Sequence, residues 1–481
     1  MEFVLYAIVA LIAVELFLRL PIVSLTKTLL SISGRAVAII SSPRISDHWK
    51  QKAILAYSGR LALTTAKLGG LFLVIVLVVY GLSIGFTLVI RTDAGPAALL
   101  MTPSGLIGTT ILSVGYFFLR ERFVKKKVNK NDYSPIERFL HHLALGMPGV
   151  AEASFDLNCA LNKSLHDYSD KRHVFIAGLA RAGTTVLMRA FYNTGRFRSL
   201  TYRDMPFVLM PNTWKSISSP FWREKALDER AHGDRVKINY DSPEALEEVF
   251  WRTFCGDDYI LENCLKPHNV NDEIIEKFRR YVSLIISSAG DERKNTYLSK
   301  NNNNILRLPS IKKAFPNALI LVPFRDPVQQ AMSLKRQHER FCERHSSDRF
   351  SFRYMTWLGH HEFGDTHKPF VFDRAKVKDN DRRPTQDIHY WIDLWTDTYS
   401  YLLDQQTDNI LFVSYENLCS KPVELLSRLF QVTNPELSLE GEDIDFSANI
   451  VSAPEGLDDN IMERAAGIYA ALQERTRWAN T

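Results

Sequence analysis

A long apolar run, Leu61 to Ile90, constrains the amino-terminal part of this chain more than any other feature. It contains the segment LGGLFLVIVLVVYGLSIGFTLVI, in which no residue is charged. About 20 consecutive apolar residues are enough to span the hydrocarbon core of a bilayer. A helix that is apolar on all sides must be buried completely in protein or lie in lipid. The run therefore predicts a transmembrane helix.

Two further apolar stretches flank this run. Phe3 to Ile22 is interrupted by Glu15 and Arg19, whereas Ala97 to Leu119 contains no charge. The first stretch lacks the charged start and the small-residue cleavage site of a signal peptide. A buried core helix remains its alternative interpretation. We expect residues 1–130 to form a membrane region with about three transmembrane helices and the lipid bilayer as its partner.

The distribution of lysine and arginine predicts the orientation of this region, because cytoplasmic loops carry an excess of both. The loop before Leu61 and the segment after Leu119 are basic: Lys27, Arg35, Arg44, Lys50, Lys52 and Arg60, then Arg120, Arg122, Lys125, Lys126, Lys127 and Lys130. Both are cytoplasmic at once only if the amino terminus lies outside. We therefore expect an integral protein of the inner or plasma membrane with its large domain in the cytoplasm, the basic cluster facing anionic headgroups.

Charge and cysteine content exclude several classes for the remainder of the chain. Residues 1–130 carry fifteen lysines and arginines against five acids, so the remainder carries 44 against 49. That balance does not indicate a nucleic-acid partner. The five cysteines are scattered, without a CxxC or Cys/His pattern. They predict neither a disulfide framework nor a metal site, and they fit a reducing compartment.

Residues 131–481 have the composition of one globular domain without long linkers or repeats. Short apolar segments at His173 to Ala177, Leu319 to Pro323 and Ile410 to Ser414 predict strands, and helical patterns lie between them. Such alternation predicts an α/β fold of the P-loop type, with a mainly parallel sheet flanked by helices on both faces.

The first chemical motif is HVFIAGLARAGTTVLMRAF, residues 173–191. It predicts a buried strand, a loop from Gly178 to Gly183, and a helix that opens at Thr184 and Thr185. The amino terminus of such a helix offers backbone amides to an anion, and glycine allows close approach. A phosphate or sulfate site is implied. Thr184 stands where a nucleotide kinase would have lysine, which weakens an ATPase interpretation.

The second motif is ALILVPFRDPVQQAMSLKRQ, residues 318–337, again a strand followed by a helix. Arg325 leaves the strand, Asp326 and Pro327 are expected to cap and start the helix, and Ser333 follows eight residues after the arginine. The rigid fork of arginine donates two parallel charge-assisted hydrogen bonds. Arg325 and Ser333 could thus share one phosphate.

Together these motifs resemble the sulfotransferases that use 3′-phosphoadenosine 5′-phosphosulfate (PAPS), most closely the branch of tyrosylprotein and carbohydrate sulfotransferases. Arg181, Gly183, Thr184 and Thr185 match the 5′-phosphosulfate loop, which also contains Gly178 and Ala182 here, and Arg325 with Ser333 matches the 3′-phosphate element. Lys300 in YLSKNNNN, and Tyr415, Glu416, Leu418 and Pro422 in VSYENLCSKP, are similar to further motifs of that branch. The resemblance covers residues 174–432 and implies PAPS as donor without a metal. The glycine-rich adenine motif of the soluble members is not visible.

Sulfonate transfer needs positive charge at the leaving phosphate and a proton acceptor near the attacking group. Arg181 and Lys300 suit the first task. In the resembling enzymes a glutamate follows the donor helix after a short turn, and the corresponding acid here is Asp204 in SLTYRDMPF. Asp204 is therefore the predicted catalytic base, with pairing to Arg203 or helix capping as its structural alternative. Glu247 and Glu248 are second choices, on a helix where we expect them to be solvated.

Three other segments gave weaker signals. The patch His360 to Glu362 predicts a surface loop rather than a metal site. The stretch Gln337 to Pro384 predicts either an acceptor-binding lid or a solvated excursion. The asparagines 301–304 could cap a helix or form a turn, and one amide could touch substrate.

The sequence thus predicts an enzyme that transfers a sulfonate group from PAPS to a hydroxyl or amine. A membrane anchor suggests a glycan, glycolipid or lipid-linked acceptor, although no residue selects among them. A P-loop nucleotide kinase or phosphotransferase remains one alternative, and it would need magnesium ligands that the sequence does not place. An inactive binding protein of the same fold remains the other.

Overall fold

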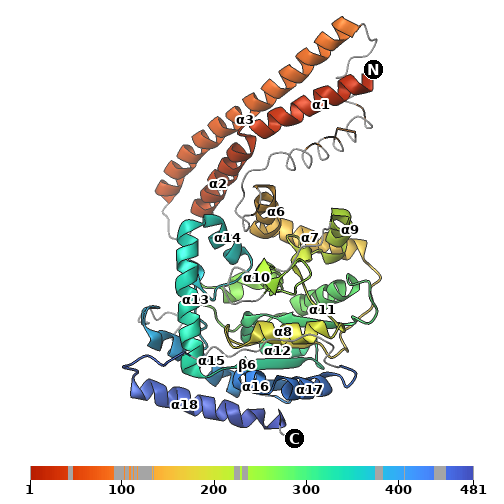
Figure 1. Ribbon diagram of the computed structural model, residues 1–481. Helices are drawn as coiled ribbons and strands as arrows, with labels where there is room; N and C mark the ends of the chain where they lie inside the picture. The colour runs from red at the N-terminus through yellow and green to blue at the C-terminus, as the bar shows by residue number, and fades with distance from the viewer. Residues whose placement is uncertain are drawn as a thin grey trace. The chain divides into compact units, whose positions relative to one another are not determined.

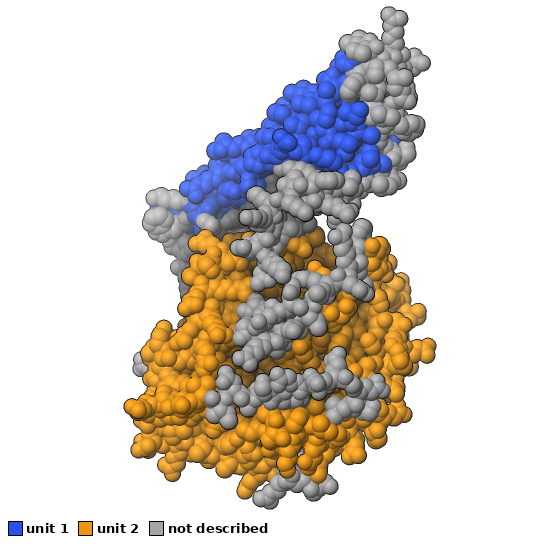
Figure 2. Space-filling model, viewed as in Figure 1, with its two compact units in different colours: residues 1–132 blue, residues 133–481 orange. Residues whose placement is uncertain are grey.

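The structure is a computed structural model of the chain (Figure 1). It describes residues 2–41, 47–90, 135–221, 228–229, 237–373, 383–405, 407–437 and 451–479, with isolated positions between 102 and 133. The chain divides into two compact units, Met1–Asp132 and Tyr133–Thr481, which Figure 2 shows in different colours.

The first unit contains the helices α1 (Glu2–Arg19), α2 (Ile22–Ser41) and α3 (Asp47–Ile90). Within the described residues, one segment, Ala53–Gly85 of α3, is long and apolar enough to cross a membrane. The predicted span at Phe3 to Ile22 is wrong, because α1 ends at Arg19 and its apolar part, Ala7–Phe17, is too short. Most of the predicted third span, residues 97–119, lies outside the described residues.

The second unit is built on a five-stranded sheet in the order β2-β5-β1-β6-β7. The strands are β1 (Val174–Ile176), β2 (Phe197–Arg198), β5 (Thr296–Lys300), β6 (Leu319–Phe324) and β7 (Ile410–Ser414), and all neighbours pair in parallel. A separate antiparallel pair joins β3 (Asp228–Glu229) and β4 (Lys237–Ile238). The predicted α/β fold with its parallel sheet is confirmed, as are the three predicted strands.

Helices cover both faces of this sheet, because successive side chains of a strand point to opposite faces. Val174 and Ile176 of β1 lie in one apolar cluster with residues of α8 (Thr184–Asn193) and α17 (Pro422–Thr433). Phe175 and Ala177 lie in the other cluster with residues of α10 (Glu248–Tyr259), α11 (Asp272–Ser287), α12 (Leu308–Ala314) and α15 (Ile388–Asp404). The strands are apolar on both faces, which is typical of a buried parallel sheet.

The remaining helices complete the second unit. They are α6 (Pro135–Gly146), α7 (Pro148–Leu161), α9 (Pro211–Ser218), α13 (Pro327–Ser347), α14 (Arg349–Trp357), α16 (Tyr415–Ser420) and α18 (Asp459–Glu474). Short 3-10 turns occur at Tyr202–Asp204, Ser219–Phe221, Asn302–Arg307, Gly364–Thr366 and Arg475–Ala479. Long helix α13 packs along α15, which in turn packs against α18 (Figure 1).

Local signals explain where the functional helices start. Asp326 caps α13 by accepting a hydrogen bond from the Gln329 amide at 2.9 Å, and Pro327 is its first residue. Proline suits this position because its missing N–H would have no partner there. Helix α8 begins at Thr184 directly after Gly183. Both predicted starts are confirmed, and both helices begin at the carboxyl end of a strand.

Candidate active site at the strand ends

The carboxyl ends of the parallel strands bring the predicted donor-site residues to one edge of the sheet. Lys300 ends β5 and pairs in register with Ile176 of β1, two residues before Gly178. Arg325 follows β6, and Tyr415 follows β7. Ligands of open α/β sheets bind outside these strand ends, where neighbouring connections leave in opposite directions. The central strand β1, between β5 and β6, provides such a point.

The loop between β1 and α8 has a backbone that few sequences allow. Arg181 has φ 70° and Gly183 has φ 84°. A side chain at Gly183 would place its Cβ 2.8 Å from the Tyr415 ring, and one at Gly178 would lie 2.9 Å from the Pro323 carbonyl oxygen. A non-glycine residue with positive φ costs on the order of 1–3 kcal/mol and is found mainly at functional sites. The conformation of Arg181 is therefore a further sign of a binding loop.

Two arginines meet at this loop. Arg181 donates from Nε to the Ser333 hydroxyl at 3.1 Å. The Arg325 guanidinium lies over the Tyr415 ring, 4.6 Å from its centroid, and the charges of both arginines act on the Tyr415 hydroxyl. Sequence analysis grouped Ser333 with Arg325, and the structure adds Arg181 to the same cluster. The cluster concentrates positive charge beside the amino termini of α8 and α13, which is an arrangement for binding anions.

Contacts of the VSYENLCSKP segment explain why its residues belong to the site. Glu416 accepts a hydrogen bond from the Asp326 amide at 2.9 Å and one from the Ser414 hydroxyl at 3.0 Å. It therefore fixes the start of α13 relative to β7. Leu418 is fully buried, and Pro422 is the first residue of α17. The segment positions Tyr415 under the arginine.

Asp204 lies in the 3-10 turn Tyr202–Asp204, which follows the edge strand β2, and several donors surround its carboxylate. Arg198 Nη2 donates to both oxygens, at 2.7 and 2.9 Å, and the backbone amide and hydroxyl of Thr201 donate to one of them. These contacts cap the 3-10 turn Tyr202–Asp204. Of the two structural alternatives for Asp204, capping is confirmed, whereas pairing with Arg203 is wrong, because Arg203 binds Asp241 instead. The role of Asp204 as catalytic base stays a prediction.

Glu247 and Glu248 are buried, so the expectation that they are solvated is wrong. Glu248 accepts hydrogen bonds from both terminal nitrogens of Arg307, at 2.8 and 3.0 Å, and one from Asn301 Nδ2 at 2.6 Å. Burial acts to raise the pKa of Glu248, but Arg307 outweighs it and the pKa lies below its ordinary value. Burial raises the pKa of Glu247, which accepts from Trp251 and Tyr297. Both glutamates therefore connect buried side chains of α10, β5 and the turn Asn302–Arg307 by hydrogen bonds.

The asparagine run connects this core to the loop after Lys300. Asn301 caps the turn Asn302–Arg307, which confirms the expected capping role. Asn302 donates from Nδ2 to Glu362 Oε1 at 2.8 Å, and Asn303 donates to the Gly359 carbonyl at 3.1 Å. The side chains of both asparagines therefore reach the segment around Glu362.

A pocket opens beside the donor loop. Its apolar lining includes Leu179, Ala180, Leu265, Leu334, Pro369, Phe370, Trp391 and Leu394, and its polar lining consists of Asn302, Asn303, His361, Glu362, His367 and Lys368. The interpretation of His360 to Glu362 as a surface loop is wrong, because His361 is buried and hydrogen-bonded to the Thr366 carbonyl. The segment predicted as a lid or solvated excursion contributes part of this wall. The pocket was not predicted, since its residues are far apart along the chain.

Three oxygens of the pocket residues are buried without a hydrogen-bond partner: Asn302 Oδ1, Asn303 Oδ1 and Glu362 Oε2. His360 Nδ1 lies 3.8 Å from Glu362 Oε2. Leaving a buried acceptor unpaired costs about 1–3 kcal/mol. Such oxygens are rare in folded proteins, and their concentration here indicates a place where a ligand supplies the donors.

Residues 173–367 match the sulfotransferase family. Three crystal structures of sulfotransferases are similar: from Alicyclobacillus acidocaldarius (13% identity, 64% of this chain and 94% of that chain covered, TM-score 0.33), Mycobacterium tuberculosis (12%, 72% and 88%, 0.36) and Mycobacterium avium (13%, 71% and 79%, 0.36). No curated protein sequence matches.

The TM-scores are below 0.5, so the assignment depends on the family match. That match includes the donor loop, Lys300, Arg325, Ser333 and Glu362. It selects the sulfotransferase interpretation over the P-loop phosphotransferase. The chain carries a domain of the sulfotransferase family, and it is a PAPS-dependent transferase.

Proposed function

We propose that the protein transfers a sulfonate group from PAPS to a hydroxyl of a glycan or glycolipid associated with a membrane. The donor site consists of the loop residues Gly178, Arg181, Ala182, Gly183, Thr184 and Thr185 for the 5′-phosphosulfate, and Arg325 with Ser333 for the 3′-phosphate. The loop is so tight that a Cβ at Gly183 would fill it, and two arginines converge beside it. This arrangement fits a ligand with two anionic groups. The donor supplies the sulfonate group and a phosphate leaving group.

The unpartnered oxygens of the pocket are the observation that supports this acceptor class. The unpartnered atoms of Asn302, Asn303 and Glu362 are all oxygens that accept hydrogen bonds. A matching ligand must therefore carry several hydrogen-bond donors. Sugar hydroxyls are such donors, and an amine on a sugar would serve equally. The apolar walls formed by Trp391, Phe370 and neighbouring leucines suit the faces of a sugar ring or the start of a lipid chain.

Glu362 is the proposed proton acceptor of the reaction. The acceptor oxygen would attack sulfur while the bond from sulfur to the phosphate oxygen breaks, and the hydroxyl proton would pass to Glu362 Oε2. Asn302 orients the carboxylate through Oε1. His360 donates from Nε2 to the Ala245 carbonyl at 2.9 Å, and its Nδ1 lies 3.8 Å from Glu362 Oε2. Arg181 and Lys300 would stabilise charge on the leaving phosphate.

Transfer of labelled sulfonate tests the acceptor class. Purified full-length protein incubated with PAPS carrying labelled sulfonate and a membrane extract is expected to place label in the glycolipid or polysaccharide fraction. Treatment that cleaves glycosidic bonds should release this label on sugar fragments. Label confined to proteins, or to lipids without sugar, would contradict the acceptor class while leaving the transferase activity in place.

We further propose that α3 anchors the enzyme in a membrane. At 1.5 Å per residue, its 44 residues extend about 66 Å, more than twice the roughly 30 Å of a hydrocarbon core. Its apolar segment is largely exposed, including Leu73, Val76, Leu77 and Tyr80. A continuous exposed apolar surface of this kind suits lipid. The predicted cytoplasmic position of the catalytic domain would give the site direct access to cytosolic PAPS.

A reporter fused after Thr481 tests this orientation. The basic loops before Leu61 and after Leu119 predict that the carboxyl terminus is cytoplasmic, so a reporter that is active only in the cytoplasm should be active. Extraction with alkaline carbonate should leave the protein in the membrane pellet. A reporter active only outside would reverse the orientation, and release by carbonate would exclude a spanning helix.

A further inference from the structure

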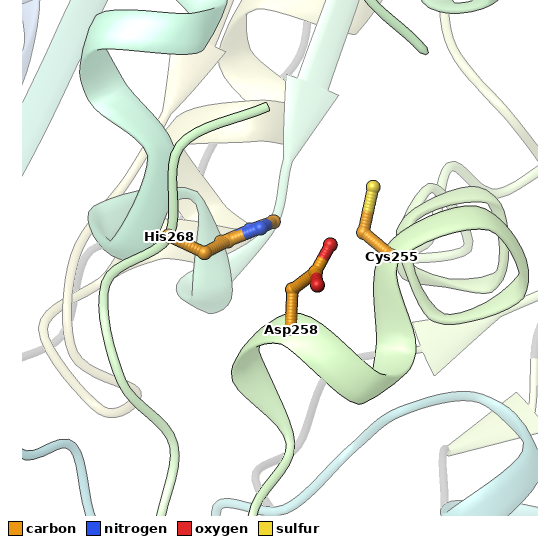
Figure 3. Close-up of side chains that lie close together, drawn as sticks. All are labelled: Cys255, Asp258 and His268. Carbon is orange, nitrogen blue, oxygen red and sulfur yellow. The ribbon is translucent and has the colours of Figure 1, made fainter. Parts of the chain in front are cut away.

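A second polar cluster lies in the same unit, at the end of α10. It consists of Cys255, Asp258 and His268, whose Sγ, carboxylate oxygen and ring nitrogen all lie within 4.8 Å of one another. Cys255 and Asp258 are three residues apart on α10 and thus on one helix face. Figure 3 shows the His268 ring directed at both of them from the segment that follows the helix. None of the three lines the pocket beside the donor loop.

His268 supplies an independent observation. The side chain is 8% exposed, and neither of its ring nitrogens has a hydrogen-bond partner. One face of the ring stacks on Tyr259, with 4.8 Å between centroids and 22° between planes, which orients the ring edge but satisfies neither nitrogen. Histidine is the commonest metal ligand among side chains, and zinc sites combine imidazole with thiolate and carboxylate. The unpartnered nitrogens therefore point to a missing ligand.

We propose that Cys255, Asp258 and His268 bind a zinc ion. Sulfur, nitrogen and carboxylate oxygen together are the ligands of zinc, whereas calcium and magnesium prefer sites made only of oxygen. Tetrahedral zinc at its usual bond lengths separates two ligand atoms by about 3.6 Å. The observed limit of 4.8 Å would thus close by about 1.2–1.4 Å at most. Asp258 is exposed, so solvent can supply the fourth ligand and the metal an entry path.

Neighbouring charges are compatible with a divalent cation. The Arg307 guanidinium acts electrostatically on both Cys255 and His268, but Glu248 pairs with it through two hydrogen bonds. Asp258 and a Cys255 thiolate would then carry the two negative charges that zinc balances. Because Glu248 neutralises Arg307, the arginine charge does not oppose the binding of a divalent cation at this site.

The zinc ion would tie α10 to the segment that forms part of the pocket wall. Leu265, three residues before His268, exchanges backbone hydrogen bonds with Pro369 and Val371 at 2.9 and 2.8 Å. Leu265, Pro369 and Phe370 all line the pocket. A zinc ion bound here would hold this wall of the pocket against the helix.

Metal loading of the full-length protein tests the proposal. Protein stripped with a chelator, reloaded with zinc under reducing conditions and separated from free metal is expected to retain one zinc ion per chain. Cys255→Ser and Asp258→Asn should each weaken zinc binding, measured by competition with a chromogenic chelator, by at least about 10-fold. Cys264→Ser is the matched control, since Cys264 is also buried but lies outside the cluster, and it should bind zinc normally.

Cobalt substitution identifies the ligand directly. Cobalt-loaded protein should show a thiolate-to-cobalt charge-transfer band that Cys255→Ser removes and Cys264→Ser retains. Because Asp258 is exposed, Asp258→Asn should fold even if Cys255→Ser does not. No retained zinc in the wild-type protein, equal affinity in Asp258→Asn, or a cobalt spectrum without the thiolate band would each overturn the site.

Discussion

Glu362→Gln is expected to reduce sulfonate transfer by roughly 10²- to 10⁴-fold, the range that a positioned acid-base group contributes. Glutamine keeps the size of the side chain and the hydrogen bond from Asn302, but it cannot take the proton. Glu362 Oε2 is buried, without a hydrogen-bond partner, at the pocket beside the donor loop. Affinity for the product 3′-phosphoadenosine 5′-phosphate (PAP) should remain nearly unchanged, because the donor-site residues are separate. Turnover and calorimetric binding, measured on the same preparation, check both expectations.

Asp204→Asn tests the alternative that Asp204, rather than Glu362, is the catalytic base. Arg198 and Thr201 occupy both Asp204 oxygens, so we expect this variant to lower the melting temperature more than it lowers turnover. Glu343→Gln is the neutral control, since Glu343 is exposed on α13. If Asp204→Asn abolishes turnover with folding and PAP binding intact, while Glu362→Gln remains active, Asp204 is the base as the sequence predicted. Loss of turnover only in Glu247→Gln or Glu248→Gln would instead move the base to the buried pair.

Arg325→Ala is expected to weaken PAP binding by about 1.5–3 kcal/mol, the contribution of a hydrogen bond to a charged group. That free energy corresponds to roughly 10- to 150-fold in the dissociation constant. Arg325 is 8% exposed and lies over Tyr415, so its guanidinium is held in place before the ligand binds. A guanidinium that is already fixed loses little conformational freedom when the ligand binds. We therefore expect a loss in the upper part of this free-energy range.

The control for Arg325→Ala is Arg336→Ala. Arg336 is exposed on α13, the helix that follows Arg325. Its replacement by alanine changes the net charge by the same unit. PAP affinity of Arg336→Ala should match that of the wild-type protein at physiological salt. Equal weakening by both substitutions would mean that the effect is the general field of the protein rather than contact with a phosphate. Ser333→Ala should weaken binding less than Arg325→Ala, because its hydroxyl is neutral.

Sequence patterns predicted the parts of the fold that depend on local residues. The strands around Val174, Leu319 and Ile410 are continuous apolar runs bounded by polar residues, and each was confirmed. Helix starts at Thr184 and Pro327 followed from a glycine loop and from a cap with proline. Strand β2 could not be predicted, because two residues carry no periodicity and its pairing with β5 is made nearly 100 residues later in the chain.

The gathering of Lys300, Arg325 and Tyr415 at one edge of the sheet was predictable, because each stands at the end of an apolar strand. Parallel strands place such ends together, whatever their distance in sequence. The pocket around Glu362 was not predictable. Glu362 faces Asn302 across 60 residues, and the burial of Glu248 depends on Arg307, 59 residues away. On a helix pattern alone Glu248 is one more polar residue, and only the tertiary partner decides that it is buried.

Nucleotide selectivity tests the central assignment of the strand-end cluster most directly. Calorimetry should compare PAP with adenosine 5′-phosphate, which lacks only the 3′-phosphate, on wild-type protein and on Arg325→Ala. We expect wild-type protein to prefer PAP by roughly 10-fold or more, from the charge-assisted contacts of one phosphate. Arg325→Ala should remove most of this preference while binding adenosine 5′-phosphate as before. Equal affinity of wild-type protein for the two nucleotides, or a preference that survives in Arg325→Ala, would contradict the assignment of Arg325 and Ser333 to the 3′-phosphate.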